Sequence, residues 1–401
     1  MNWFKSTPKR IYLDYAAATP VAKEVIAEMS KYWRESFANA GSIHQEGVLA
    51  KQAIDSAREK VARTLRVRAT DIIFTSGGTE SNNLAIRGAV KGMMDSGVKA
   101  DDIEIISTRT EHPSISKVLG ELQKLGIHIK YISVGEDGLI NFDEFQKSLS
   151  FKTRLVTIAY ANSEVGVVQD LGKISRAIKS FEKKNGLQIY FHTDASQAPM
   201  WLPCALDALG VDMLTLEAGK CEGPKGVGVL VKRPRVFIKS VSFGGSQEDG
   251  LRPGTEPVSL IVGAAKAIEL AQTDFLARSQ KVTTIRNKWV KQLRTLPVVL
   301  INGDIDNRLP NNVNISIPKF DTEFAVIYLD KAGIAASTKS ACSGAGSGKS
   351  TVVYEMTKDI DRASATIRFT LSPTTSLGEL SQVTQVLKSY LAKMASFNDV
   401  K

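Results

Sequence analysis

The segment Leu216-Glu217-Ala218-Gly219-Lys220-Cys221-Glu222-Gly223-Pro224-Lys225-Gly226-Val227-Gly228 places one lysine in a turn rich in glycine and proline. Glycine and proline at these positions favour a tight, defined turn. The turn follows an apolar run that is predicted to be a strand, so Lys220 presents its amine at the end of that strand. A lysine held in this way can form a Schiff base with a carbonyl compound, and we expect Lys220 to be catalytic.

Working outward from this turn, short apolar runs alternate with longer helical patterns through the first two thirds of the chain. The predicted strands are Asp71–Thr75, Ile103–Ser107, Ile129–Ile132, Leu155–Tyr160, Gln188–His192 and Met213–Leu216, and a helix is expected from near Glu80. This alternation predicts an α/β fold with a mainly parallel sheet flanked by helices. Such sheets bind ligands at the carboxyl ends of their strands, so motifs at those ends carry the most weight.

The pattern changes after Pro257. The expected elements are one helical stretch from Val258 to Thr283 and onward to Leu296, strands at Asn312–Ile317 and Ala365–Leu371, and a helix near Thr322–Ala332. We predict a large ligand-binding domain over residues 11–260. A smaller α+β domain is predicted over residues 261–396, with some N-terminal residues joining it.

Composition excludes several classes of protein. The chain has 401 residues, of which 43% are hydrophobic and 23% charged, which is enough for a large core. Its net charge of +10 comes from scattered basic residues, so direct nucleic-acid binding is not expected. Residues 1–10 lack the apolar run of a secretory signal, and no stretch reaches the roughly 20 apolar residues of a membrane span. We expect a cytoplasmic enzyme.

Three cysteines, Cys204, Cys221 and Cys342, are too few and too far apart for a disulfide framework or a metal site, so reduced thiols are expected. Cys342 stands in Ser340-Ala341-Cys342-Ser343-Gly344-Ala345-Gly346-Ser347-Gly348, a run of small residues able to carry a thiol into and out of a site. Cys221 is adjacent to Lys220. It is either a second reactive thiol or, as we favour, a packing residue.

Two strand ends carry candidate cofactor contacts. Thr75-Ser76-Gly77-Gly78-Thr79-Glu80 joins a strand to a helix, so Gly78 and Thr79 can bind an anion at the helix N-terminus. The alternative is an ordinary turn with Thr79 as the N-cap. Asp194 follows another apolar strand, where its carboxylate can accept from a pyridinium N–H or simply cap the next turn.

Three further side chains have both a functional and a structural interpretation. His112 can stack on a planar ring or carry a proton, or be structural. Asn162 can bind a ring hydroxyl or stabilise a turn. Arg368, between Ile367 and Phe369, can clamp a substrate carboxylate or form a structural ion pair.

The ending Gly348-Lys349-Ser350 is reminiscent of a nucleotide-binding P-loop. That pattern requires a glycine five positions before Gly348, where Ser343 stands, and no clear apolar strand leads into the loop. Nucleotide hydrolysis is therefore not expected.

In these segments taken together, the chain resembles cysteine desulfurases of the NifS/IscS kind, within the class-V, fold-type I pyridoxal phosphate (PLP) enzymes. The resemblance covers nearly the whole chain. Its other matching segments are Ile11–Pro20, Asn39–Gly47, Asn162–Asp170 and Arg252–Val258.

This resemblance implies a role for each candidate residue in binding PLP. Lys220 forms the Schiff base, Asp194 pairs with the pyridine nitrogen, and His112 stacks on the ring. Gln197 and Asn162 contact the ring oxygen and the substrate side. Gly78 and Thr79 bind the phosphate, and Thr255 reaches it from the neighbouring subunit of a homodimer.

The resemblance also implies the substrate chemistry. Arg368 holds the carboxylate of L-cysteine, and Cys342 takes the sulfur as a persulfide and passes it to an acceptor. An iron-sulfur scaffold and a tRNA-thiolation enzyme are both compatible acceptors. Selenocysteine lyase, cysteine sulfinate desulfinase and aminotransferase activities share the fold and stay open, as does a cofactor-poor sulfur-relay or scaffold protein.

One departure concerns the phosphate. The family has Ser-x-His-Lys at this turn, and this chain has Glu217-Ala218-Gly219-Lys220, which removes two phosphate contacts. An ionised Glu217 would repel the phosphate. We expect weaker cofactor binding unless Glu217 points away, is protonated or pairs with a basic residue such as Lys225.

Overall fold

The computed structural model describes residues 10–338 and 348–398, and its centre is a seven-stranded sheet. The strands lie in the order β2 (Ile72–Thr75), β8 (Gly228–Lys232), β7 (Met213–Glu217), β6 (Tyr190–Asp194), β5 (Thr153–Thr157), β3 (Glu104–Thr108) and β4 (His128–Ile132). β8 is antiparallel to both of its neighbours, and all other pairs are parallel. The expected α/β fold with a mainly parallel sheet is confirmed.

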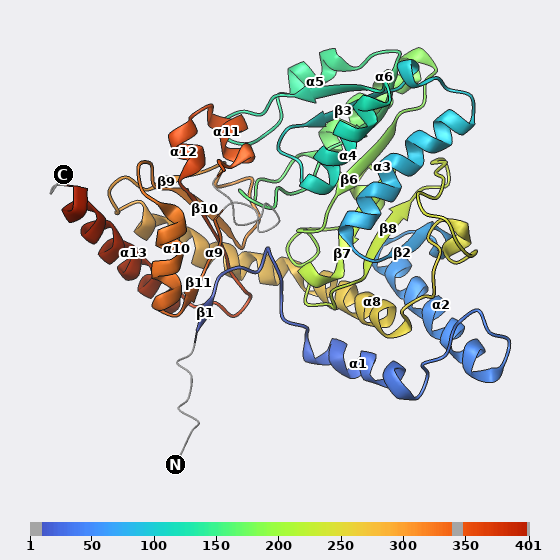
Figure 1. Cartoon of the computed structure of the whole chain (residues 1–401), viewed down its shortest axis with the longest axis horizontal. Helices are drawn as coiled ribbons and strands as arrows, with labels where there is room; N and C mark the ends of the chain where they lie inside the picture. The colour runs from blue at the N-terminus through green and yellow to red at the C-terminus, as the bar shows by residue number, and fades with distance from the viewer. Residues whose placement is uncertain (1–9, 339–347, 399–401) are drawn as a thin grey trace.

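Helices cover both faces of this sheet (Figure 1). β8 has apolar side chains on both faces of the sheet. Val229 and Val231 join a core cluster with α2 and α8, whereas Leu230 joins a cluster with α3 and α4. Successive residues of a strand point to opposite faces, so a strand that is apolar throughout must be buried on both.

The helices of this larger part are α1 (Lys23–Arg34), α2 (Gln45–Leu65), α3 (Gly78–Asp95), α4 (Pro113–Lys124), α5 (Phe142–Ser148), α6 (Leu171–Asn185), α7 (Leu206–Leu209) and α8 (Val258–Thr273). Within the described residues, four short 3₁₀ turns interrupt the loops: η1 (Ala69–Asp71), η2 (Ala100–Asp102), η3 (Ala218–Lys220) and η4 (Glu248–Gly250). The third of them carries Lys220.

A second, smaller sheet lies at the left of Figure 1, with the C-terminal helices around it. It contains β12 (Thr366–Thr370), β10 (Asn312–Ser316) and β9 (Leu300–Ile301), all antiparallel. The helices are α9 (Phe275–Leu293), α10 (Thr322–Lys331), α11 (Thr351–Thr357), α12 (Ile360–Ser364) and α13 (Leu377–Asn398). Trp289 of α9 meets Phe369 of β12 edge-on, with ring centroids 5.3 Å apart.

The start of the chain also joins this part, because β1 (Ile11–Tyr12) pairs in parallel with β11 (Ile334–Ala335). The division into domains at residue 260 stays a prediction. Among the helices in the described ranges, none is both long and apolar enough to cross a membrane.

The structure corrects three local predictions. The helical stretch expected from Val258 to Leu296 is two helices, separated at Asp274, whose backbone (φ −123°, ψ 26°) is not helical. Aspartate is a poor helix former because its side chain competes for backbone hydrogen bonds. β5 ends at Thr157 rather than Tyr160, and Asp194 is the last residue of β6 rather than lying beyond it. β8 was not predicted from sequence, although Val229, Leu230 and Val231 form an apolar run.

Truncation of Phe369 tests the packing of the small sheet. Phe369 is fully buried against Trp289, so Phe369→Ala is expected to lower the free energy of unfolding by about 3–5 kcal/mol. Phe151→Ala is the matched control, because 68% of Phe151 is exposed. Urea denaturation of both variants measures the difference, and equal losses would contradict the packing described here.

Candidate active site

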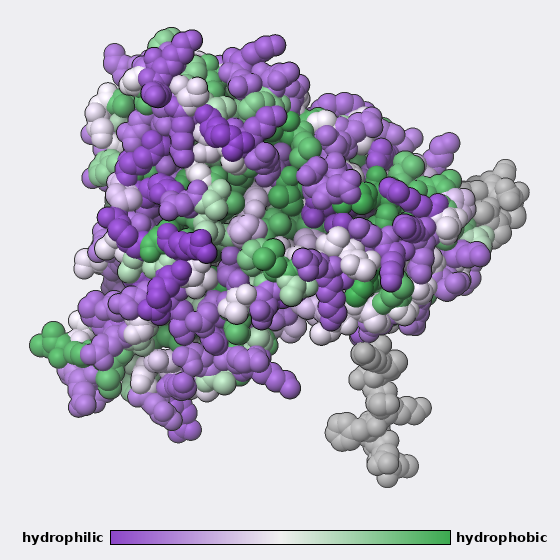
Figure 2. Space-filling model, turned by 180° about the vertical axis from the view of Figure 1, so that it is seen from behind, coloured by the Kyte–Doolittle hydropathy of each residue, from purple (hydrophilic) through white to green (hydrophobic). Residues whose placement is uncertain are grey.

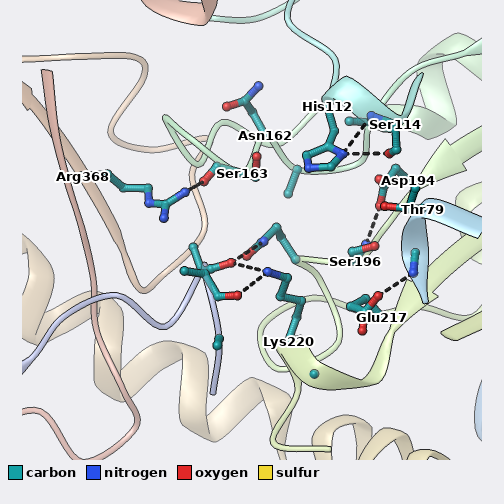
Figure 3. Close-up of a pocket in the computed structure, with 18 of the residues that line it drawn as sticks. Thr79, His112, Ser114, Asn162, Ser163, Asp194, Ser196, Glu217, Lys220 and Arg368 are labelled. Carbon is teal, nitrogen blue, oxygen red and sulfur yellow. Dashed lines mark hydrogen bonds between the residues drawn. The ribbon is translucent and has the colours of Figure 1, made fainter. Parts of the chain in front are cut away.

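A cavity of about 290 Å³ opens at the carboxyl ends of β5, β6 and β7 (Figure 3). Eight of the residues proposed from sequence line it: Gly78, Thr79, His112, Asn162, Asp194, Gln197, Lys220 and Arg368. Thr255 is exposed and does not line it within this chain, so its proposed contact would require a second subunit. Cys342 lies outside the described residues.

Lys220 is held over the cavity by the start of the chain. Its Nζ donates to the carbonyl oxygens of Ala16, at 2.9 Å, and Ala17, at 2.5 Å. Gln197 Nε2 also donates to Ala16, at 3.1 Å. These backbone acceptors were not predictable from sequence, because every residue has a carbonyl group and only the fold brings these two to the lysine.

Asp194 is fixed on both carboxylate oxygens. Oδ1 accepts from the Ser196 N–H at 2.9 Å, and Oδ2 accepts from Asn82 Nδ2 at 2.8 Å. Asn82 lies on α3 and is fully buried. This role of Asn82 was not predicted, because the bond joins segments 112 positions apart and only the packing of α3 against β6 brings them together. The pair keeps the Asp194 carboxylate oriented to accept a further N–H.

His112 is the N-cap of α4, and its imidazole faces the cavity (Figure 3). Nδ1 accepts from the Ser114 N–H at 3.2 Å and contacts Ser114 Oγ at 2.7 Å, so the neutral ring carries its proton on Nε2. Burial lowers the pKa of His112; nearby Asp194 opposes this shift, and Lys220 adds to it. The side chain is therefore an uncharged ring at neutral pH, suited to stacking.

Asn162 has the turn role that the sequence left open. Its Oδ1 accepts from the backbone N–H groups of Glu164 and Val165, both at 2.9 Å, and its Nδ2 donates to the Thr110 carbonyl at 2.9 Å. The residue ties the segment after β5 to the segment after β3. Its contact with a ring oxygen or substrate stays a prediction.

Arg368 forms the ion pair that the sequence left open, and its role as a carboxylate clamp stays a prediction. It is 2% exposed, it lines the cavity, and its Nη2 forms an ion pair with Asp14 Oδ1 at 2.8 Å. Nη1 donates to the Ser163 carbonyl at 3.0 Å. A guanidinium has five N–H donors, so these two bonds orient the group and leave capacity for a substrate carboxylate.

The glycine turn before α3 holds a carboxylate of the chain itself. Gly78 N–H donates to Glu217 Oε2, and Gly77 rather than Thr79 is the N-cap, which makes the predicted Thr79 cap wrong. Glu217 does not point away from the cradle. Lys225 does not neutralise it through a salt bridge in the described chain, because Lys225 Nζ donates to the Thr19 carbonyl at 3.3 Å.

These groups fit PLP at the ring end. Three groups surround one cavity: the amine of Lys220, the carboxylate of Asp194 as a fixed acceptor for a ring N–H, and the uncharged aromatic ring of His112. At the phosphate end, the N-terminus of α3 is a suitable anion site, but Glu217 occupies its first free N–H.

The two described cysteines are buried packing residues. Cys204 is fully buried and Cys221 is 2% exposed, with Cys221 Sγ 3.4 Å from the Ala218 carbonyl oxygen. Burial raises the pKa of Cys221 to about 12 and also raises that of Cys204. The packing interpretation of Cys221 is confirmed.

Comparisons with known proteins give a consistent picture. The family model described as Aminotransferase class-V matches residues 11–383. A protein of Dictyoglomus turgidum named cysteine desulfurase IscS is 38% identical over 394 residues, covering 98% of this chain and 97% of its own. A solved NifS-like protein is 32% identical with a TM-score of 0.88, covering 96% of this chain and 100% of its own. A structure titled SspA in complex with cysteine is 31% identical with a TM-score of 0.77, covering 92% and 100%.

Thiol labelling tests the inertness of the buried cysteines. A thiol with a pKa near 12 holds about one part in ten thousand as thiolate at pH 8. Native Cys342→Ser protein is therefore expected to take up no dithionitrobenzoate at pH 8, whereas the same protein unfolded in guanidinium is expected to react at Cys204 and Cys221. Rapid loss of a thiol in the native variant would contradict this expectation.

Proposed function

The chain belongs to the class-V aminotransferase family, whose members depend on PLP, and we propose that it is a cysteine desulfurase that converts L-cysteine to L-alanine and a persulfide. The observation that carries the proposal is the meeting of Lys220, Asp194, His112 and Arg368 at one cavity. This arrangement provides an amine, a ring-nitrogen partner, a stacking ring and a carboxylate clamp. The similarity to cysteine desulfurases along nearly the whole chain supports the choice of reaction.

Substrate binding begins at Arg368. Its guanidinium binds the cysteine carboxylate, and its bonds to Asp14 and the Ser163 carbonyl hold it in one orientation. A fixed clamp orients the α-amino group and thiol of cysteine toward the Lys220 end of the cavity. Positioning of this kind lowers the entropic part of the barrier.

Lys220 moves the protons. Bound PLP supplies a ring that withdraws electrons and stabilises negative charge at the substrate carbons. Asp194 supports this withdrawal by accepting the ring N–H, and Asn82 and the Ser196 N–H keep its carboxylate in place. The Lys220 amine, once free, takes the proton from the substrate α-carbon and later returns a proton to the product.

Cys342 receives the sulfur. Its thiolate attacks the substrate sulfur, so that an S–S bond forms, the C–S bond breaks, and the bonding electrons remain with the three-carbon fragment. Protonation of that fragment gives alanine. This role rests on the sequence around Cys342, a run of serine, alanine and glycine.

A second copy of the chain is the proposed partner of one apolar end. Figure 2 shows apolar surface projecting at its lower left, near the segment that joins α1 to α2 in Figure 1. Trp33 on α1 is 60% exposed, and Phe37 and Ile43, in the segment between α1 and α2, are 70% and 98% exposed. A homodimer would cover such side chains and bring Thr255 to the partner's phosphate end.

An iron-sulfur scaffold or a tRNA-thiolation enzyme would accept the sulfur. We propose that the enzyme works in the cytoplasm.

Sulfide release from L-cysteine tests the proposed reaction. Wild-type protein with added PLP and a thiol reductant is expected to release sulfide and alanine in equal amounts, and Cys342→Ala is expected to abolish the sulfide because the attacking thiol is lost. Sulfide release that persists in Cys342→Ala would contradict the role of Cys342. Alanine formation and cofactor absorbance, measured on the same samples, show whether that variant still binds cofactor.

Replacement of Arg368 tests the carboxylate clamp. Arg368→Lys keeps the charge opposite Asp14 but loses the forked geometry, so kcat/KM for cysteine is expected to fall about ten- to hundredfold, mainly through KM. The absorbance of bound cofactor should not change. An unchanged KM would show that Arg368 serves only the ion pair.

A further inference from the structure

Three glycines enclose the carboxylate of Glu217. A Cβ atom added to Gly77 would lie 2.9 Å from Glu217 Oε2, one added to Gly78 would lie 3.4 Å from the same oxygen, and one added to Gly219 would lie 3.4 Å from Oε1. Gly77 has φ of 153°, a conformation that favours glycine. The turn before α3 and the turn at Lys220 thus together form a close fit around one carboxylate.

This carboxylate lies at the place where an anion is best stabilised. α3 is 18 residues long, and its N-terminal N–H groups and dipole favour negative charge. Gly78 N–H donates directly to Glu217 Oε2. Burial, the largest influence, raises the pKa of Glu217 overall, and the Gly78 hydrogen bond and the positive charge of Lys220 oppose part of this rise. The helix terminus therefore offsets part of the cost of burying this carboxylate, by the same interaction that would stabilise a phosphate.

A phosphate group cannot share this cradle with Glu217 at no cost. It must either take the Gly78 N–H from the carboxylate or lie beside this half-buried carboxylate, which is itself close to Asp194. Displacement of Glu217 leaves a partly buried carboxylate without this donor, which offsets what the phosphate gains. The ring contacts of Lys220, Asp194 and His112 do not depend on the phosphate.

We propose that Glu217 supplies the anion of its own cradle, so that this site holds unphosphorylated pyridoxal with nearly the affinity it has for PLP. Glu217 is thus the residue that sets cofactor specificity at the phosphate end. This inference rests on the proposed function, in which a pyridoxal-type aldehyde binds at Lys220. It concerns only the contribution of the phosphate group.

Paired titrations measure that contribution. Cofactor-free protein is titrated with pyridoxal and, separately, with PLP, and the absorbance of the lysine-bound aldehyde gives both dissociation constants. The ratio of the pyridoxal constant to the PLP constant is expected to be below about tenfold in the wild type. It is expected to rise a further ten- to hundredfold in Glu217→Ser, because this change frees the Gly78 N–H for phosphate.

Two further variants make the comparison specific. Glu222→Ser is the matched control, because Glu222 is a half-buried carboxylate of the same turn but does not line the cavity. The ratio of the two dissociation constants in this variant should equal that of the wild type. Glu217→Gln removes the charge and keeps the shape of the side chain, so it should also raise the ratio if Glu217→Ser fails to fold. Thermal melting identifies the folded variants.

The outcomes separate the inference from the proposed function. If both aldehydes bind and the wild type prefers PLP by about a thousandfold or more, with no change in the folded Glu217 variants, the role of Glu217 is wrong while the proposed function stands. If neither aldehyde gives a lysine-bound absorbance in any folded variant, the proposed function is wrong, and the inference falls with it.

Discussion

The parallel pairing of β3, β5, β6 and β7 is the constraint on which the site depends. Because these strands run in the same direction, the segments that follow them must emerge at one edge of the sheet. Segments far apart in the sequence therefore supply His112, Asn162, Asp194 and Lys220 to a single cavity. Helices bury the sheet on both faces, and hydrogen bonds within the chain hold Asp194 and Lys220 at this edge.

The sequence was sufficient for the parts of the site that follow this rule. Lys220, Asp194 and His112 each stand beside a recognisable apolar strand, and each lies where the α/β pattern predicts. The groups that orient them were not predictable in the same way. The bonds from Asn82 to Asp194 and from Asp14 to Arg368 join segments with no local signal for one another. Such pairs become visible only when the packing is known.

Glu217 shows how far a local departure can be interpreted from sequence. An acidic residue in place of a phosphate-binding one predicts a conflict, but three ways of resolving it remain open without coordinates. In the structure the carboxylate takes the Gly78 N–H and fills the space that three glycines leave. A helix N-terminus of this kind can bind a phosphate, but in this protein it binds the side chain of Glu217. The consequence concerns how much more tightly the site binds PLP than pyridoxal, not whether it binds a cofactor at all.

The most direct test of the site as a whole is to locate the covalent bond between cofactor and protein. Protein incubated with PLP and reduced with borohydride is digested, and mass spectrometry identifies the lysine that carries the pyridoxyl group. The geometry described here predicts a single modified residue, Lys220, with the modification lost in Lys220→Ala. Modification of another lysine, or none in folded protein, would contradict the assignment of this cavity as the catalytic site.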